Sequence, residues 1–475
     1  MKKLYIDFSP YFARTALVND GELIEFGVEH AARRGHVGNI YKGKVENVLG
    51  GMKAAFVNIG LQRNGFLYIG DRADKISPGD IVMCQVAKEE WSAKGARLTM
   101  DVTLPGYNLV LLPNGGFRGV SRKIEDEQAR DELEKFVSSI CPPNMGFIVR
   151  SAAVKAPFEE IAEEAKELVE LWNKIEADYA KARPTTTVYR EAQLIERVLR
   201  DSFAEDVDGV VVNDPTLAVK LAEKYGSGVE CYTGARNIFK EFGISEQIDK
   251  LADRKVQMEG GAYLVIDRTE ALTVIDVNTG RYVGSKDLED TVFRTNLVAA
   301  REVAKQLRVR NISGIVIIDF IDMQLDEHRR AVLDALREEL KKDRLKTSAV
   351  AMTGLGLVEL TRKRTRLPAD TFMLEPCSEC GGGYVVSSTH LALKLRDELV
   401  EFTLRNDFSS VIARAHPDVV GRIFSGRIMA REVLGLLRGK RVYFVADYSL
   451  ARDKFEIEGT NDKVLTLPQS ARLLY

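Results

Sequence analysis

Two aspartates lie at the ends of apolar, β-branched stretches, and a helical pattern separates the two stretches. Asp276, with Asn278 two positions on, lies at the end of Leu272–Asn278, and Asp319 ends Gly314–Asp319. Because alternate strand residues share a face, and because a strand, a helix and a second strand place the strand ends side by side, these three polar side chains are expected on one face. Two carboxylates and an amide oxygen suit a Mg²⁺ ion that keeps several waters and takes a substrate phosphate. The pattern therefore predicts a magnesium site with Asp276 and Asp319 as ligands and Asn278 orienting them.

Either carboxylate alone has a structural explanation, because aspartate is common at turns and strand ends. The metal site is favoured because the three groups occur together and the segment between them is helical. Its apolar residues recur at spacings of three or four, or their sum. They are Leu288, Val292, Ala299, Val303 and Leu307.

A second candidate metal site is the sequence Pro-Cys-Ser-Glu-Cys-Gly-Gly-Gly, in which Cys377 and Cys380 offer two thiolates to zinc. Two ligands are half of a tetrahedral site, so a complete site requires the same loop of another subunit. A redox dithiol is the alternative, but that motif opens a helix after a strand, and three glycines follow here. The remaining cysteines, Cys84, Cys141 and Cys231, stand alone, as a reducing compartment allows.

Residues 36–101 consist of short β segments separated by glycine turns, which is typical of a small barrel of OB type. Phe56, Phe66 and Tyr68 are interleaved there with lysines and arginines, including Lys94. Rings that stack on bases and cations that follow phosphates are what a single nucleic-acid strand requires. Aromatic residues on alternate strand positions more often belong to a core than to a binding surface, so the signal lies in the whole module.

Length and composition set the broad class. A chain of 475 residues is too long for one core and predicts about three domains. The net charge of −2 argues neither for nor against a nucleic-acid partner. We expect no membrane span and a cytoplasmic location, because the sequence has no long apolar run and no charged-then-apolar leader. The first strands, within residues 4–26, are too few for a core and are expected to pair with Val210–Val212.

Several motifs closely resemble the ribonuclease E/G family. In residues 38–67, Gly-Asn-Ile-Tyr-Lys-Gly-Lys-Val, Ala-Ala-Phe-Val-Asn-Ile-Gly and Asn-Gly-Phe-Leu resemble its RNA-binding OB domain. The segments 106–114 and 146–153, the strands of Asp276 and Asp319, and the Cys377–Cys380 sequence match in the same order. The resemblance covers essentially the whole chain. The shorter members, without a long C-terminal scaffold region, are the better match.

The resemblance implies an α/β and α+β multidomain protein. Its parts would be an RNase H-like domain in two segments (1–35 and 189–255), the OB-fold RNA-binding domain (36–101), a 5′-sensor region (102–188), a DNase I-like catalytic domain (256–375), a zinc link (376–384) and a small C-terminal α/β domain (385–475).

The resemblance also implies roles for particular residues. Arg150 and Ser151 would hold an RNA 5′-monophosphate, with Gly106 and Val110 lining the pocket. A guanidinium grips a terminal phosphate through two hydrogen bonds, and a hydroxyl adds a donor. Ser151 stands where the family commonly has threonine. Serine keeps the hydroxyl group and lacks the methyl group.

The implied activity is that of a Mg²⁺-dependent endoribonuclease that cleaves single-stranded, A/U-rich RNA in rRNA maturation and mRNA decay, leaving 5′-phosphate and 3′-hydroxyl ends. Phe56, Phe66 and Lys94 would bind the RNA, and a shared zinc site would join a homodimer, with the pairing of dimers left open. A non-catalytic RNA-binding assembly factor is the alternative. A DNA nuclease that uses the same metal is a third, and a preference for RNA over matching DNA would separate the two nucleases.

Overall fold

The structure is a computed structural model, and it describes the chain except for short segments. These are residues 10–11, 31–34, 71–74, 91–94, 122, 193, 203–206, 227, 281–287, 365–367, 381–382, 427, 430–434, 463–464 and 475. The chain divides into two compact units, one made of Met1–Arg33 with Asp208–Tyr475 and the other of Arg34–Val207. The second unit is therefore an insertion between two parts of the first.

The first unit begins with a five-stranded sheet in the order β15-β14-β1-β2-β3. Its strands are β1 (Lys2–Ser9), β2 (Phe12–Asn19), β3 (Glu22–His30), β14 (Gly209–Val212) and β15 (Val229–Cys231), and the helices of this part are α4 (Pro215–Tyr225), α5 (Ile238–Glu241) and α6 (Ser245–Asp249). Asp20 and Gly21 form the turn between β2 and β3 with positive φ angles of 48° and 85°. β1 pairs in parallel with β14, so the pairing predicted from the sequence is confirmed.

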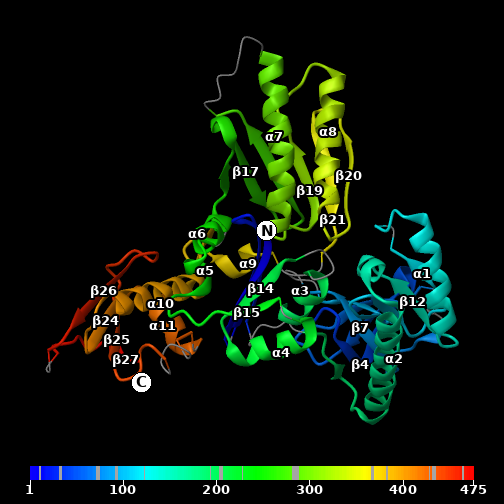
Figure 1. Cartoon of the computed structure of the whole chain (residues 1–475), viewed down its shortest axis with the longest axis horizontal. Helices are drawn as coiled ribbons and strands as arrows, with labels where there is room; N and C mark the ends of the chain where they lie inside the picture. The colour runs from blue at the N-terminus through cyan, green and yellow to red at the C-terminus, as the bar shows by residue number, and fades with distance from the viewer. Residues whose placement is uncertain are drawn as a thin grey trace. The chain divides into compact units, whose positions relative to one another are not determined.

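A six-stranded sheet in the order β16-β17-β18-β19-β21-β20 carries the two carboxylates. Its strands are β16 (Lys255–Gln257), β17 (Tyr263–Arg268), β18 (Leu272–Asn278), β19 (Gly314–Asp319), β20 (Thr347–Met352) and β21 (Leu357–Arg362). The helices α7 (Leu288–Val309) and α8 (Asp326–Lys341) lie side by side on one face (Figure 1). The apolar stripe of α7 packs with Ile275, Val316 and Ile318 in one core. The other face of this sheet is here called the open face.

The chain continues through α9 (Asp370–Met373) into a two-stranded hairpin of β22 (Leu374–Pro376) and β23 (Tyr384–Val386). The long helix α10 (Ser388–Arg405) follows, with the Ser387 hydroxyl accepting a hydrogen bond from the His390 amide at its N-cap. A four-stranded sheet in the order β26-β24-β25-β27 completes the unit. Its elements are β24 (Ser410–Ala415), α11 (Pro417–Ser425), β25 (Arg441–Ala446), β26 (Phe455–Thr460) and β27 (Ala471–Leu473).

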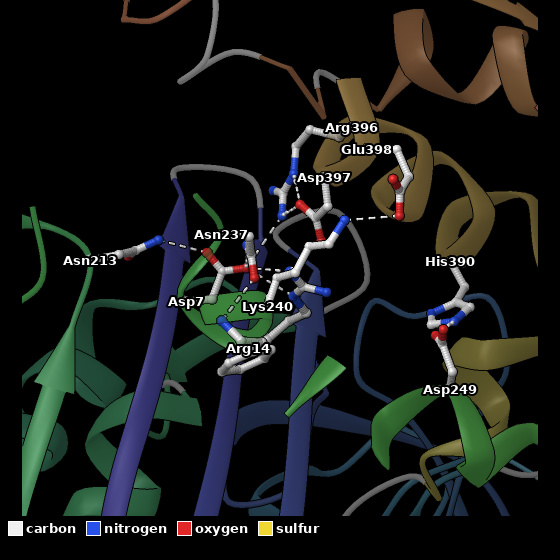
Figure 2. Close-up of polar contacts among 11 residues, drawn as sticks. Asp7, Arg14, Asn213, Asn237, Lys240, Asp249, His390, Arg396, Asp397 and Glu398 are labelled. Carbon is white, nitrogen blue, oxygen red and sulfur yellow. Dashed lines mark hydrogen bonds and ion pairs between the residues drawn. The ribbon is translucent and has the colours of Figure 1, made fainter. Parts of the chain in front are cut away.

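Buried charges attach α10 to the first sheet. Figure 2 shows Arg396 and Asp397 reaching from α10 towards Asp7 on β1 and Arg14 on β2. Arg14 donates to Asp7 over 2.9 and 2.5 Å, and Arg396 donates to Asp397 over 2.8 and 2.7 Å. Burial alone raises the pKa of the Asp7 carboxyl, but the two guanidinium charges and the hydrogen bonds from Arg14 and Asn237 outweigh it and hold the pKa below its usual range. The four charged residues Asp7, Arg14, Arg396 and Asp397 are here called the Asp7 cluster.

The second unit contains a closed five-stranded barrel of OB type, in which β4 pairs with both β5 and β7. The barrel strands are β4 (Ile40–Leu49), β5 (Ala54–Asn58), β6 (Gly65–Tyr68), β7 (Ile81–Lys88) and β8 (Arg97–Thr99), and β13 (Thr186–Tyr189) adds to β4. Alternate residues such as Ala55, Val57 and Leu67 fill the barrel core. The barrel predicted from the sequence is therefore confirmed.

The rest of the second unit is a four-stranded sheet packed with two helices in one core. Its elements are β9 (Leu104–Pro105), β10 (Leu109–Leu112), β11 (Gly119–Val120), α1 (Glu127–Ile140), β12 (Gly146–Val149) and α2 (Phe158–Lys181), followed later by α3 (Leu194–Ser202). The buried face of α2 repeats at three- and four-residue spacings through Ile161, Ala165, Leu168, Trp172 and Ile175. In neither unit does a described helix combine the length and the apolar character that crossing a membrane requires.

Candidate active site on the open sheet face

The carboxylates of Asp276 and Asp319 end neighbouring parallel strands of the central sheet. β18 and β19 pair in parallel, and Asp276 is the Cα partner of Asp319. Both side chains are exposed, whereas the alternating residues Ile275 and Ile318 are fully buried on the helix side. The register and the alternation therefore place the two carboxylates next to each other on the open face, where the sequence predicted them.

Asn278 lies on the same face and contacts the first carboxylate. Its Nδ2 donates a hydrogen bond of 2.7 Å to Oδ2 of Asp276. This contact fixes one carboxylate oxygen and leaves Oδ1 for another partner. The side-chain amide of Asn278 thus orients the Asp276 carboxylate. The sequence analysis expected Asn278 on this face.

The charges at this site repel one another. Partial desolvation, and then the negative charges of Asp276 and Asp322, raise the pKa of the Asp319 carboxyl. A bound cation would relieve this repulsion, since an opposite charge favours the ionised carboxylate. The electrostatics thus fit a cation-binding site.

The donor set distinguishes between cations. Among the described residues, no group of three or more histidines, cysteines, aspartates or glutamates is arranged to hold a metal ion. Two carboxylates with an amide oxygen cannot supply the six to eight oxygen ligands that Ca²⁺ takes. They do suit Mg²⁺, which binds through one or two carboxylates and keeps its remaining positions for water and phosphate oxygens.

Two residues of α7 that the sequence analysis missed hold the segment after Asp319. Asn296 is fully buried; its Nδ2 donates to the Ile321 carbonyl over 2.8 Å, and its Oδ1 accepts from the Ile321 amide over 3.1 Å. Glu289 accepts from the amides of Gln324 and Leu325. The sequence did carry a signal for Asn296, because an amide at a buried position of an amphipathic helix needs a partner.

The two candidate zinc ligands lie at the tip of the β22–β23 hairpin. The Cys377 amide donates to the Gly383 carbonyl over 2.8 Å, and the Gly383 amide donates to Sγ of Cys380 over 3.2 Å. A methyl group at Gly383 would lie 3.2 Å from Sγ of Cys380 and 3.9 Å from Cβ of Cys377. The cysteines therefore flank one glycine, with Cys380 exposed, and the hairpin presents both at the surface.

The residues expected to bind a 5′-phosphate meet where β9 and β12 end and β10 begins in the second unit's four-stranded sheet. Arg150 follows β12, and its Nη1 donates to the Gly106 carbonyl over 2.5 Å. Ser151 comes next and begins a short 3₁₀ turn. Val110 is the partner of Ile148 on β10, which puts it on the same face as Arg150. The structure thus brings these four half-buried residues together.

A carboxylate that the sequence analysis missed lies beside this group. Glu164 of α2 accepts hydrogen bonds from the amides of Tyr107 and Asn108, the latter over 2.8 Å. Burial raises the pKa of Glu164 against the lowering effect of these bonds and of the Arg150 charge. An added Cβ at Gly106 would lie 2.1 Å from Oε1 of Glu164, so a larger residue there would displace this carboxylate. Glu164 and Arg150 therefore hold the loop of residues 106–108 between them.

The outer surface of the barrel carries the aromatic residues. Phe56 and Phe66 are partners on β5 and β6, and their ring centroids lie 6.1 Å apart at 73°. Phe56 is exposed and Phe66 is half-buried, so the rings point outward rather than into the core. Lys94 lies outside the residues that the structure describes, but the exposed Arg97 is the strand partner of Phe66 on β8. Arg97 is a cation that the sequence analysis did not single out.

These features define a mixed α/β protein with a closed OB-type barrel and an acidic sheet face. Comparison with known proteins narrows the class. A model of the ribonuclease E/G family matches residues 103–365. Ribonuclease G of Escherichia coli K12 is 37% identical over 96% of this chain and 99% of its own length. Ribonuclease G of Haemophilus influenzae is 35% identical with the same coverage of both chains. Ribonuclease E of a Nostoc species is 37% identical over 73% of this chain and 54% of its own length. The chain belongs to the ribonuclease E/G family.

Proposed function

We propose that this protein is a metal-dependent endoribonuclease that cleaves single-stranded RNA on the open face of its central sheet. One observation carries the proposal: Asp276 and Asp319 are register partners on an exposed sheet face, with Asn278 hydrogen-bonded to the first of them. The relatives with which the chain aligns almost end to end are named ribonucleases, which supports RNA as the substrate.

Asp276 and Asp319 would hold a Mg²⁺ ion. The bound ion supplies an activated water and neutralises charge on the phosphate under attack. In the reaction, water oxygen forms a bond to phosphorus, the bond from phosphorus to the 3′ oxygen breaks, and a proton ends on that oxygen. The products are a 5′-phosphate and a 3′-hydroxyl. Asn278 fixes the orientation of Asp276, and Asn296 and Glu289 fix the segment that follows Asp319.

Other parts of the chain would select and hold the RNA. The outward rings of Phe56 and Phe66 offer stacking surfaces for bases, with Arg97 beside them and Lys94 as a further cation. Arg150 and Ser151, in a pocket lined by Gly106 and Val110, would bind a 5′-monophosphate. These contacts raise the local RNA concentration and favour substrates that carry this end group.

Cys377 and Cys380 would supply half of a zinc site, and the same hairpin of a second protomer would supply the other half. The hairpin leads directly into α10, which the Asp7 cluster fastens to the first sheet, so a zinc link would join two firmly held elements. The expected assembly is a homodimer, and the expected targets are A/U-rich single strands in rRNA precursors and mRNA in the cytoplasm.

The test uses a 5′-monophosphorylated, A/U-rich oligoribonucleotide with the full-length protein, with and without Mg²⁺. Wild type should cleave only with the metal, and Asp319→Asn should lose cleavage while keeping RNA affinity. Asp326→Asn is the matched control, because Asp326 is an exposed carboxylate at the start of α8. Equal loss of binding and cleavage in Asp319→Asn would contradict the assignment. Binding by wild type without cleavage under any metal would favour the RNA-binding assembly factor instead.

A further inference from the structure

The open face extends beyond the carboxylate pair onto β17 and β16. In the antiparallel pairing of β17 with β18, Tyr263 is the partner of Asn278 and Val265 is the partner of Asp276. On the next strand, Lys255 is the partner of Val265. Because directly paired residues project on the same side of a sheet, Tyr263 and Lys255 lie on the face that carries Asp276 and Asp319.

Lys255 and Tyr263 contact each other on this face. The Lys255 Nζ lies 3.6 Å from the centroid of the Tyr263 ring, which is the geometry of a cation–π contact. Lys255 is exposed and Tyr263 is half-buried. The aromatic ring thus holds the ammonium group on the face that carries the carboxylates, two strands from Asp276, and leaves its remaining donors directed to solvent.

The Lys255 ammonium group forms no ion pair with the described residues of the chain, whereas its neighbour Arg254 is paired with Asp267 over 2.6 Å. Lys255 is also the one cation among the described strand residues of the open face. A polyanion that lies on this face is repelled by Asp276 and Asp319, and the charge of Lys255 offsets part of that repulsion.

The Tyr263 ring is also supported from the chain that follows β18. Gly280 has a φ of +59°, and an added Cβ there would lie 2.2 Å from the Gly261 carbonyl oxygen and 3.3 Å from Cδ1 of Tyr263. A glycine at 280 therefore allows the two segments to pass in contact beside the ring. The ring has fixed neighbours, and this reduces the entropy that a binding partner would otherwise have to remove.

We propose that Lys255 and Tyr263 form a binding subsite for the RNA strand beside the carboxylate pair. Lys255 contacts a phosphate that flanks the scissile one, and Tyr263 positions the ammonium group and offers its ring edge to the adjoining nucleotide. This inference rests on the proposed function, because it assumes that RNA lies across the open face. It adds one backbone contact that holds the strand in register with Asp276 and Asp319.

The experiment compares Lys255→Gln with wild type in steady-state cleavage and in binding of the same oligoribonucleotide. A contact to a non-reacting phosphate acts equally on ground state and transition state, so KM should rise about two- to fivefold with kcat unchanged. The slope of log affinity against log salt should fall by about 0.7, the value for one phosphate contact to a single strand. Tyr263→Ala should reproduce the rise in KM, because it releases the ammonium group.

Lys341→Gln is the matched control. It removes one exposed lysine charge from α8, which lies on the covered side of the same sheet, and it should leave KM unchanged. A second readout uses substrates in which single phosphates near the cleavage site are replaced by neutral methylphosphonates. At one position the substitution should make wild type and Lys255→Gln equal.

The outcomes separate this inference from the proposed function. If Lys255→Gln binds and cleaves like wild type while Asp319→Asn is inactive, the subsite is wrong and the active site stands. If Lys341→Gln weakens binding as much as Lys255→Gln, or no single methylphosphonate removes the difference, the effect is general electrostatics and the subsite is wrong. If Lys255→Gln weakens binding but Asp319→Asn still cleaves, the subsite is supported and the proposed catalytic site fails.

Discussion

Replacing Arg396 with methionine should loosen the attachment of α10. Arg396 and Asp7 are 3% and 2% exposed, so the substitution removes one of two buried cations and leaves two carboxylates with Arg14 alone. Removing one partner of a buried ion pair costs about 3–5 kcal/mol. The lower end, about 3 kcal/mol, applies here, because Asp7 keeps Arg14 and two amide donors, and Asp397 is 12% exposed.

Hydrogen exchange of the α10 amides is the appropriate assay, because a chain with several cores does not unfold in one two-state step. A loss of about 3 kcal/mol corresponds to roughly a hundredfold drop in protection at residues 388–405. Peptides from the barrel should be unchanged. Arg405→Met is the matched control, since Arg405 lies on the same helix and is 69% exposed, and its partner Glu401 keeps ion pairs with Arg236 and Lys240. It should change protection by no more than about twofold.

Two further results test the reasoning behind this prediction. Adding Asp397→Leu to Arg396→Met restores one positive and one negative charge, so most of the protection should return. Because the pKa of Asp7 is lowered, its contribution to stability is present above the unfolded pKa and is lost as pH falls through the folded pKa, so wild type and Arg396→Met should converge on acidification. Unchanged protection in Arg396→Met, or a double variant worse than the single one, would refute the assignment of this cluster.

Three other predictions follow from the sites. Asp322→Asn removes a negative charge that raises the pKa of Asp319, so the acidic limb of the plot of cleavage rate against pH should move to lower pH, with the plateau rate kept. An unmoved limb would mean that Asp319 is not the group whose titration limits the rate. Glu164→Gln should loosen the loop of residues 106–108 and reduce the preference for 5′-monophosphate over 5′-hydroxyl RNA several-fold, without slowing cleavage of the 5′-hydroxyl RNA. Glu163→Gln, at the exposed neighbouring position, should leave this preference unchanged. Equal effects of the two substitutions would show that the contact of Glu164 with the loop does not set the preference. Cys377→Ser should lower bound zinc and convert the dimer to monomer in a mass measurement, as a zinc chelator should for wild type; an unchanged mass would defeat the shared site.

Local sequence patterns predicted the central sheet and its acidic residues. The β-branched runs before Asp276 and Asp319 define the strands, and the three- and four-residue spacing between them defines α7. Strand alternation then decides which side chains share a face, so the meeting of Asp276, Asn278 and Asp319 needed no knowledge of distant contacts. The barrel was predicted in the same way, from short strands and glycine turns.

The residues that support these sites were harder to predict, because their roles depend on contacts between distant segments. Glu164 is one of four glutamates in the first two turns of α2, and only its position against the loop of residues 106–108 distinguishes it from Glu163. Asp7 and Arg396 come from opposite ends of the chain, and no periodicity connects them. Arg97 lies beside Phe66 only because β8 pairs with β6, and local sequence does not encode this pairing.

The insertion of the barrel unit within the first unit has a consequence for synthesis on the ribosome. The Phe8 amide donates to Oδ1 of Asn213, a partner 205 residues further along the chain. At ribosomal rates this separation corresponds to about 10–40 s. During that interval β1–β3 emerge without β14, while the whole barrel unit is made and can fold. The nascent protein therefore carries β1 with one edge unpaired until residues 209–212 have emerged from the ribosome.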